Sequence, residues 1–502
     1  MITAPGGPTA EFLAARDGRL VAVGSAAEAE AFTRAGIPLV DFGPATVLPG
    51  FWDSHVHMLS TGRSLRETDL GAARTLAEVF DLVREAAARG YDLALCTRLD
   101  ESRLAERRLP TGAELEEAAP RVPVAAVRVD CHSLVLNPAA WRYLGVEASW
   151  PGVDREASGK PTGLLRGRAN ELARTRIHER LPAATKRRAF EEAAAHAASR
   201  GVVALAALEG GQLFGADYLR LLLDCRETLP VDVFVYPQLA SVAEVRALGL
   251  PRLGGCLLVD GSLGSQTAAL SEPYADAPTG RGELYFADDD LAALVLTAHA
   301  AGLQIALHAI GDRAVGQVLD AYGLAQAEHP RADCRHRLEH AELVADCDFA
   351  RAAELGVVFS MQPAFEWFWG GEGRMYASRL GARRRLTNRL RTPLRHGLTL
   401  AGGSDSPITP LDPRLGIAAA LNHPTAAERL SFPEALAMFT TGAATAVFAE
   451  EDYGTLAPGK WASFTVLASD PREQTAEELA SAEVVATVRR GEITYKGEKA
   501  SE

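Results

Sequence analysis

Residues 51–57 read FWDSHVH, an apolar run that ends in two histidines. Seven further apolar runs follow along the chain, and they finish in VVALAALEG, VDVFVYPQ, CLLVDG, LQIALHAIG, HRLEHA, VVFSMQP and LTLAGGSDS. Segments with helical period, rich in Ala, Leu, Glu and Arg, separate most of these runs. Eight alternating strand and helix units predict an α/β fold in which parallel strands form a (β/α)8 TIM-type barrel.

Two departures from this eightfold pattern set the expected domain boundaries. The gap between His57 and the second run at Val202 is far too long for one helix, so residues from about 60 to 185 should form an inserted α/β subdomain. Both ends of the chain read as short strands and turns. We therefore expect a small β-sandwich domain built from residues 1–48 and 446–502, around a barrel at 49–445.

The composition disfavours several classes of protein. The net charge of −13, from 52 basic and 65 acidic residues, argues against nucleic-acid and anionic-membrane partners. The first residues lack the apolar core of a signal peptide, and no run of ~18 apolar residues occurs. Six singly spaced cysteines suit reduced thiols in a cytoplasm. We expect a cytoplasmic enzyme with a small-molecule substrate; a homodimer is among the assemblies this leaves open.

Polar residues at the ends of the predicted strands indicate a metal site, because barrel active sites lie at that end. Alternation puts two histidines of the first strand on one face, and the fifth, sixth and eighth strands each end in another donor. Any one of them alone is more often a packed histidine or a helix-capping aspartate. Together they predict a divalent metal, zinc before iron or manganese, held by His55, His57, His308, His340 and Asp405.

This donor set suits hydrolysis by an activated water molecule. Zinc lowers the pKa of bound water from ~15.7 to near ~7. Asp405 can accept the proton and deliver it to a departing nitrogen, so Asp405 and His340 are the candidate catalytic residues. A serine nucleophile is disfavoured, because residues 402–406 lack the spacing of a nucleophile elbow.

Several motifs resemble those of the metal-dependent amidohydrolase superfamily. Its opening and closing signatures are matched by VLPGFWDSHVH at 47–57 and LAPGK at 456–460. DGSLGSQTA at 260–268, HAIGDRA at 308–314 and RVDCH at 128–132 resemble the YtcJ-like branch, which includes N-substituted formamide deformylases. The resemblance covers nearly the whole chain. It implies a barrel with a β-sandwich flank, one or two divalent metals, usually zinc, and hydrolysis of a C–N bond. The matching ligands are His55, His57, His308, His340 and Asp405.

One position departs from the family pattern. Many members carry a lysine four residues before the Asp-Gly of the DGS motif, and its carbamylated form bridges two metals; here the residue is Cys256. The shorter cysteine is not expected to reach the barrel axis unless the strand shifts. Glu209, at the end of the second strand, could bridge instead, although capping a helix is the commoner role. We therefore predict one tightly held metal, with bridging by Glu209 next and by Cys256 last.

Candidates for substrate contact are His132, Asp260 and Trp367. His132 matches a family histidine in the inserted subdomain, Asp260 follows the fourth strand, and Trp367 belongs to an aromatic cluster after the seventh. Each could instead have a purely structural role, and packing against the inserted subdomain is the alternative for the aromatic cluster.

The predicted function is metal-dependent hydrolysis of a non-peptide amide or formamide bond. A hydrolytic deaminase or cyclic-amide hydrolase on the same scaffold is the alternative, and release of ammonia would distinguish it. A degenerate barrel that binds metal without turnover is a third reading, against which the complete ligand set argues.

Overall fold

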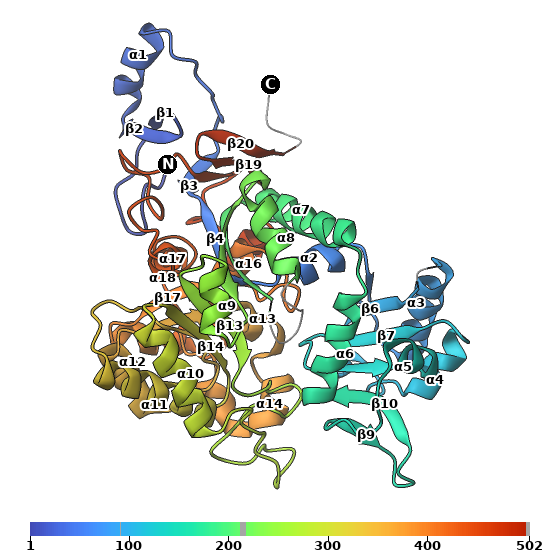
Figure 1. Ribbon diagram of the computed structural model, residues 1–502. Helices are drawn as coiled ribbons and strands as arrows, with labels where there is room; N and C mark the ends of the chain where they lie inside the picture. The colour runs from blue at the N-terminus through green and yellow to red at the C-terminus, as the bar shows by residue number, and fades with distance from the viewer. Residues whose placement is uncertain (91, 211–216, 498–502) are drawn as a thin grey trace.

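The computed structural model describes residues 1–90, 92–210 and 217–497, and it contains all eight predicted parallel strands (Figure 1). Three of them form a sheet in the order β12-β11-β4, with bounds Asp232–Pro237, Val202–Glu209 and Phe51–Val56. Five more lie in sequence order from β13 to β17, with bounds Arg252–Leu258, Gln304–Ala309, Arg337–His340, Val358–Met361 and Thr399–Gly402. The strands and their order agree with the barrel prediction.

Backbone contacts join the two sheets where β4 and β17 end. The amide of Asp405 donates to the carbonyl of His55 at 2.7 Å, and the amide of His57 donates to the carbonyl of Ser406 at 3.1 Å. Val56 and Ser406 form one isolated parallel bridge. Within the described residues the strand ladder is not continuous around all eight strands, so a closed barrel is not seen as one unbroken sheet.

Amphipathic helices pack against the parallel strands. Helix α10 (Asp288–Ala300) begins with three aspartates, whose charge favours a helix N-terminus. Its buried Leu291, Val295 and Ala298 recur at helical spacing and pack in the main hydrophobic core. Every residue of β14 is buried, as expected for a parallel strand covered on both faces. No helix among the described residues combines the length and apolarity needed to cross a bilayer.

Residues 68–166 contribute a separate six-stranded sheet, which stands beside the parallel strands in Figure 1. Its order is β5-β6-β7-β8-β10-β9, with bounds Thr68–Asp69, Ala94–Leu99, Val124–Arg128, Ser133–Leu136, Pro161–Arg166 and Val153–Arg155. Helix α3 (Leu76–Ala88) packs on it through Val79 and Val83, in a hydrophobic cluster of its own with Cys96 and Val124. This agrees with an inserted α/β segment after the first barrel strand.

The two ends of the chain meet in one small β-region. Strand β3 forms a sheet with three C-terminal strands in the order β20-β19-β18-β3, with bounds Glu492–Lys496, Val484–Arg489, Phe464–Leu467 and Thr46–Pro49 (Figure 1). A hairpin of β1 (Phe12–Arg16) and β2 (Arg19–Gly24) contributes Leu20 to a cluster with Phe464 and Val488. Strands from both termini thus share a core, as the sequence predicts; the sandwich arrangement and the domain bounds stay predictions.

Candidate metal centre

The five predicted ligands converge at the carboxyl ends of the parallel strands. His57 Nε2 lies 3.1 Å and His55 Nε2 3.3 Å from Asp405 Oδ1. The ring of His340 is 4.7 Å from that of His55 and 4.5 Å from that of His308, centroid to centroid. Apart from the slightly exposed His57, all of these side chains are buried. The cluster therefore lies where the barrel rule expects an active site, at the ends of the strands.

Fixed acceptors outside the cluster set the tautomers of the two β4 histidines. His55 Nδ1 lies 2.7 Å from the Glu339 carboxylate, and His57 Nδ1 lies 3.0 Å from the carbonyl oxygen of Leu208. These oxygens can only accept, so each Nδ1 carries the hydrogen and each Nε2 of the neutral ring presents a lone pair. Both lone pairs therefore face the centre and Asp405.

The other two histidines are held in the same manner. His340 Nδ1 is 2.9 Å from Gln362 Oε1, which leaves its Nε2 facing inward. His308 is turned the other way, because its Nε2 meets the carbonyl oxygen of Gly261 at 3.2 Å and its Nδ1 faces the cluster. Outer-shell acceptors of this kind orient histidines that bind metals.

The inner atoms of this cluster lack hydrogen-bond partners. His55 Nε2, His340 Nε2 and Asp405 Oδ1 are all buried and unsatisfied. His55 Nε2 approaches Asp405 Oδ1 at 3.3 Å, and a neutral ring whose hydrogen is on Nδ1 has no second hydrogen to give to this carboxylate. Buried polar atoms of this kind are costly unless something pairs them. A cation at the shared centre would satisfy all three, so the donor set fits a divalent metal.

Backbone strain also concentrates here. His340 has φ 72°, Ala341 has φ 50° and Asp405 has φ 56°, all in the left-handed region that non-glycine residues rarely adopt. Such strain costs roughly 1–3 kcal/mol per residue and is typical of functional sites. It turns the chain sharply just where each ligand leaves its strand.

Cys256 lies inside the cluster, contrary to the expected reach. Its Sγ is 3.6 Å from His308 Nδ1, and its ligand atom, with those of His55 and His340, forms a group within 4.8 Å. Burial alone would raise the pKa of this thiol, but the surrounding imidazoles hold the pKa well below its usual value. The sequence predicts that Cys256 reaches the centre only if its strand shifts. Strand β13 bulges in this way, and the sulfur reaches the centre.

Glu209 has a different role from the bridging one proposed for it. Its carboxylate accepts hydrogen bonds from the amide of Leu59 at 3.2 Å and from the hydroxyl of Tyr218 at 2.9 Å. Helix α2 (Met58–Ser64) follows His57 directly, so Glu209 holds the start of that helix. Burial raises its pKa to about 7. Among the described residues Glu209 belongs to none of the groups that could hold a metal, whereas Cys256 belongs to one of them.

Two residues that support the centre escaped the sequence-based prediction. Glu339 accepts from His55 and is also 2.7 Å from the fully buried Arg337. Gln362 fixes His340, as described above. The sequence did contain a signal for Glu339. Arg337 and Glu339 are charged residues in a strand that is predicted to be buried, where each needs a partner. No pattern in the sequence marks Gln362.

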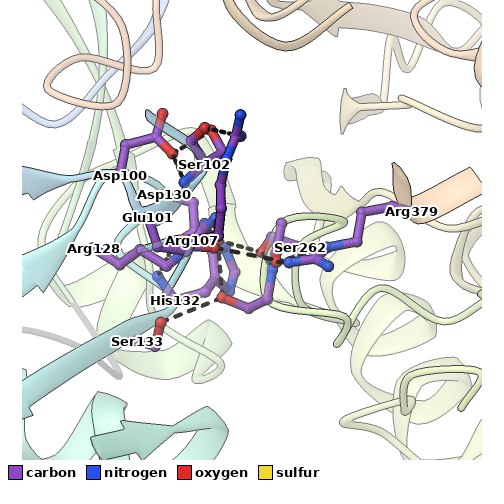
Figure 2. A network of polar contacts seen from close by, with 12 residues as sticks. Asp100, Glu101, Ser102, Arg107, Arg128, Asp130, His132, Ser133, Ser262 and Arg379 are labelled. Atoms are coloured by element: carbon purple, nitrogen blue, oxygen red, sulfur yellow. Dashed lines mark hydrogen bonds and ion pairs between the residues drawn. The ribbon is translucent and has the colours of Figure 1, made fainter. Parts of the chain in front are cut away.

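His132 does lie in the cavity beside the centre, with its ring centroid 5.6 Å from that of His308. Figure 2 shows the polar network that carries its loop: Asp130 accepts from Ser262 Oγ at 2.6 Å and pairs with Arg128 at 2.7 Å. Arg128 in turn pairs with Glu101 at 2.8 Å. The network ties the inserted sheet to the loop after β13. Burial lowers the pKa of His132 to about 4, so it is a neutral ring at pH 7.

Asp260 is a structural residue and does not face the substrate cavity. Its carboxylate accepts from the backbone amides of Ala269, Ile310 and Gly311 at 2.8–2.9 Å, and it is fully buried. It lies 3.6 Å from His308 Nε2, so it positions the loops around that ligand.

Trp367 also lies away from the centre. Helix α13 (Ala364–Trp369) places Phe365 and Trp369, four residues apart, on one face, and both line the cavity beside His340 and Asp405. Trp367 lines a neighbouring cavity with Arg98 and Asp100 of the inserted segment, and Trp369 and Ile408 line both cavities. The aromatic cluster thus lines the cavity and also faces the inserted segment, and a contact of Trp367 with substrate stays a prediction.

A second histidine cluster shows what a satisfied site looks like. His299, Cys334 and His336 are buried and close enough to hold a metal. However, His299 bonds the carbonyl of His329 at 2.7 Å and His336 at 2.8 Å, and His336 Nδ1 accepts from the amide of Ile305. Every ring nitrogen has a partner, so this cluster is packing and carries no open ligand position.

Comparisons with known proteins place this geometry in context. A family model described as the amidohydrolase family matches residues 39–495. The Bacillus subtilis protein YtcJ, provisionally named an amidohydrolase, is 29% identical over 91% of this chain and 90% of its own. The N-substituted formamide deformylase of Arthrobacter pascens is 26% identical, over 95% and 94%. A crystal structure of an uncharacterized metal-dependent hydrolase from Pyrococcus furiosus is 32% identical, covers 92% and 95%, and has a TM-score of 0.72.

Proposed function

The chain belongs to the amidohydrolase family, in its YtcJ-like branch, and from this premise we propose that it hydrolyses a non-peptide amide of the formamide type at the metal centre. Hydrolysis of C–N bonds is the chemistry common to the family. The particular amide, the metal and the roles of individual residues are the proposal. We also propose that the eight parallel strands act as one barrel, flanked by a terminal β-sandwich and the insert at about 60–185.

One observation carries the proposal: each of four imidazoles has one ring nitrogen within hydrogen-bond distance of a fixed oxygen acceptor and turns the other toward a shared centre beside Asp405. Nitrogen donors in this number suit zinc better than calcium or magnesium. The ligands would be His55, His57, His308, His340 and Asp405. A divalent ion bound there supplies Lewis acidity toward the substrate carbonyl and lowers the pKa of a water molecule.

Asp405 moves the proton in this proposal. Its buried carboxylate has two oxygens, so one can bind the ion while the other accepts a proton from the attacking water. The same oxygen can then return the proton to the departing nitrogen. His340 is held by Gln362 and lines the same cavity, where it can orient the carbonyl group beside Asp405.

The walls of the cavity favour an apolar group next to the scissile bond. Beside His340 and Asp405 one part of the lining is apolar or aromatic, with Leu263, Ile310, Phe365, Trp369 and Ile408, while Arg128, Ser262 and Glu342 are among its polar members. On the other side of the centre Ser60, Glu171 and Arg174 line the cavity together with Leu258 and Tyr285. An amide with a hydrocarbon or aromatic substituent on one side fits this division.

A substrate panel tests the proposal and separates it from its rival. We would incubate the zinc-loaded protein with N-substituted formamides, N-acyl amines, ureas, cyclic amides and aminopyrimidines, and quantify amine, acid and ammonia. The proposal predicts amine and acid from an apolar amide. Ammonia as the main product would favour a hydrolytic deaminase, and no turnover of any class would favour a degenerate barrel.

A further inference from the structure

Cys256 is a sixth donor at the centre, in addition to the five ligands that match the family. Cys256 Sγ is 3.6 Å from His308 Nδ1, and it lies within 4.8 Å of a ring nitrogen of His55 and of His340. A thiol hydrogen can serve one of these lone pairs and leaves the others unpaired. The buried, unsatisfied His55 Nε2 and His340 Nε2 are therefore not explained by a neutral cysteine.

The backbone of β13 is built to bring this sulfur inward. Between the pairs Gly254–Ala306 and Leu258–His308, three residues of β13 run beside one of β14, which is a bulge. Gly254 and Gly255 have φ 97° and 91°. A Cβ on Gly254 would lie 2.0 Å from the carbonyl oxygen of Ala306, and one on Gly255 would lie 2.8 Å from Leu208. Only glycines permit the bulge that aims Cys256 at the centre.

The number of donors exceeds what one tetrahedral ion can use. Six side chains face the centre, and zinc in proteins usually takes four ligands. Two groups of three share His55: one adds His57 and Asp405, and the other adds Cys256 and His340. His308 faces the sulfur from the far side. The sulfur thus lies between two sets of nitrogen donors.

We propose that Cys256 is a thiolate ligand that bridges two metal ions in this centre. One ion is held by His55, His57 and Asp405, and the other by His308 and His340. The inference rests on the proposed metal-dependent function and revises the single-metal prediction. The bridge needs only loss of the thiol proton to solvent, since the sulfur's lone pairs form both metal bonds.

Cobalt substitution tests the bridge by a readout other than activity. We would strip the protein, load it with Co²⁺, and measure bound cobalt and the near-ultraviolet absorption from sulfur-to-cobalt charge transfer. We expect about two equivalents and a clear band in the parent. Cys256→Ser should lose the band and at least one equivalent. Cys131→Ser, which removes another thiol that lines the cavity, should keep both.

The outcomes separate the bridge from the proposed function. Bound cobalt and retained amide hydrolysis with no charge-transfer band, or a band that survives in Cys256→Ser, overturns the thiolate bridge and leaves the function standing. Failure to bind cobalt at all overturns both. If Cys256→Ser does not fold, alkylation of the parent followed by peptide mass spectrometry decides: Cys256 should be protected when metal is bound and modified after chelation, and equal modification in both states refutes the bridge.

Discussion

Glu339 offers a sharp test, because its carboxylate supports a ligand and a buried cation at once. It accepts from His55 Nδ1 at 2.7 Å and pairs with Arg337 at 2.7 Å, and all three side chains are inaccessible to solvent. Glu339→Gln keeps the shape and an acceptor oxygen but removes the charge. The variant therefore isolates the electrostatic part of the support for His55.

The size of the effect follows from these contacts. Loss of an outer-shell partner typically lowers metal affinity 10–100-fold, which corresponds to about 1.4–2.7 kcal/mol. Among the described residues, Glu339 is the acidic side chain that forms an ion pair with Arg337. The substitution therefore leaves a buried guanidinium without a counter-charge. Breaking a buried pair in this way costs about 3–5 kcal/mol. We expect a loss of stability of about 3 kcal/mol, the lower end of this range, because Ser54 and Ser360 still accept hydrogen bonds from Arg337.

The assay is competition for Zn²⁺ between the protein and a chromogenic chelator, together with thermal unfolding of the metal-free protein. Glu366→Gln is a matched control, since Glu366 is equally buried but bonds Thr387 and Asn388, away from the ligands. We expect weaker zinc binding in Glu339→Gln alone. A folded Glu339→Gln variant whose zinc affinity is within twofold of the parent's would refute the reasoning that the Glu339 carboxylate orients His55 for metal binding.

Three further predictions concern the proton carrier, the metal and a buried acid. Asp405→Asn should lower kcat by ~10²–10⁴-fold without changing the unfolding temperature, because an amide cannot relay the proton. A near-normal kcat would contradict this role. Elemental analysis of the purified protein should find stoichiometric zinc, iron or manganese, and its absence would exclude a tightly held ion. Burial raises the pKa of Glu366 to about 7 from 4.5, so the folded chain keeps a proton that the unfolded chain loses, and stability falls as pH rises between these values. At pH 8 the free energy of unfolding of Glu366→Gln should therefore exceed that of the parent by up to about 3 kcal/mol, and its unfolding temperature should be higher. This difference should close toward pH 4.5.

The sequence contained enough to predict the strands and the ligand cluster. Eight apolar runs ended in polar residues, and the rule that parallel strands present their carboxyl ends together brought His55, His308, His340 and Asp405 to one place. This works because the hydrophobic pattern fixes which residues are strands, and the fold class then fixes where their ends meet.

Features that depend on local backbone detail were not predictable. The reach of Cys256 depends on a two-residue bulge at Gly254 and Gly255, and a pair of glycines in a strand does not by itself specify which way the chain bends. The choice between Trp367 and its neighbours depended on where α13 begins, since a shift of two residues turns a side chain to the opposite face. The hydrogen bonds of Asp260 could not be predicted, because its partner Ile310 lies in the loop after another strand.

The most direct test of the central claim is the rate of hydrolysis of one apolar N-substituted formamide, measured on a single preparation in three states. These are the protein as purified, the same protein after chelation and dialysis, and the stripped protein after stoichiometric zinc is returned. The arrangement of lone pairs around Asp405 predicts that turnover is lost on stripping and recovered with zinc. A rate that is unchanged after the metal has been removed would contradict the assignment of this centre as the site of catalysis.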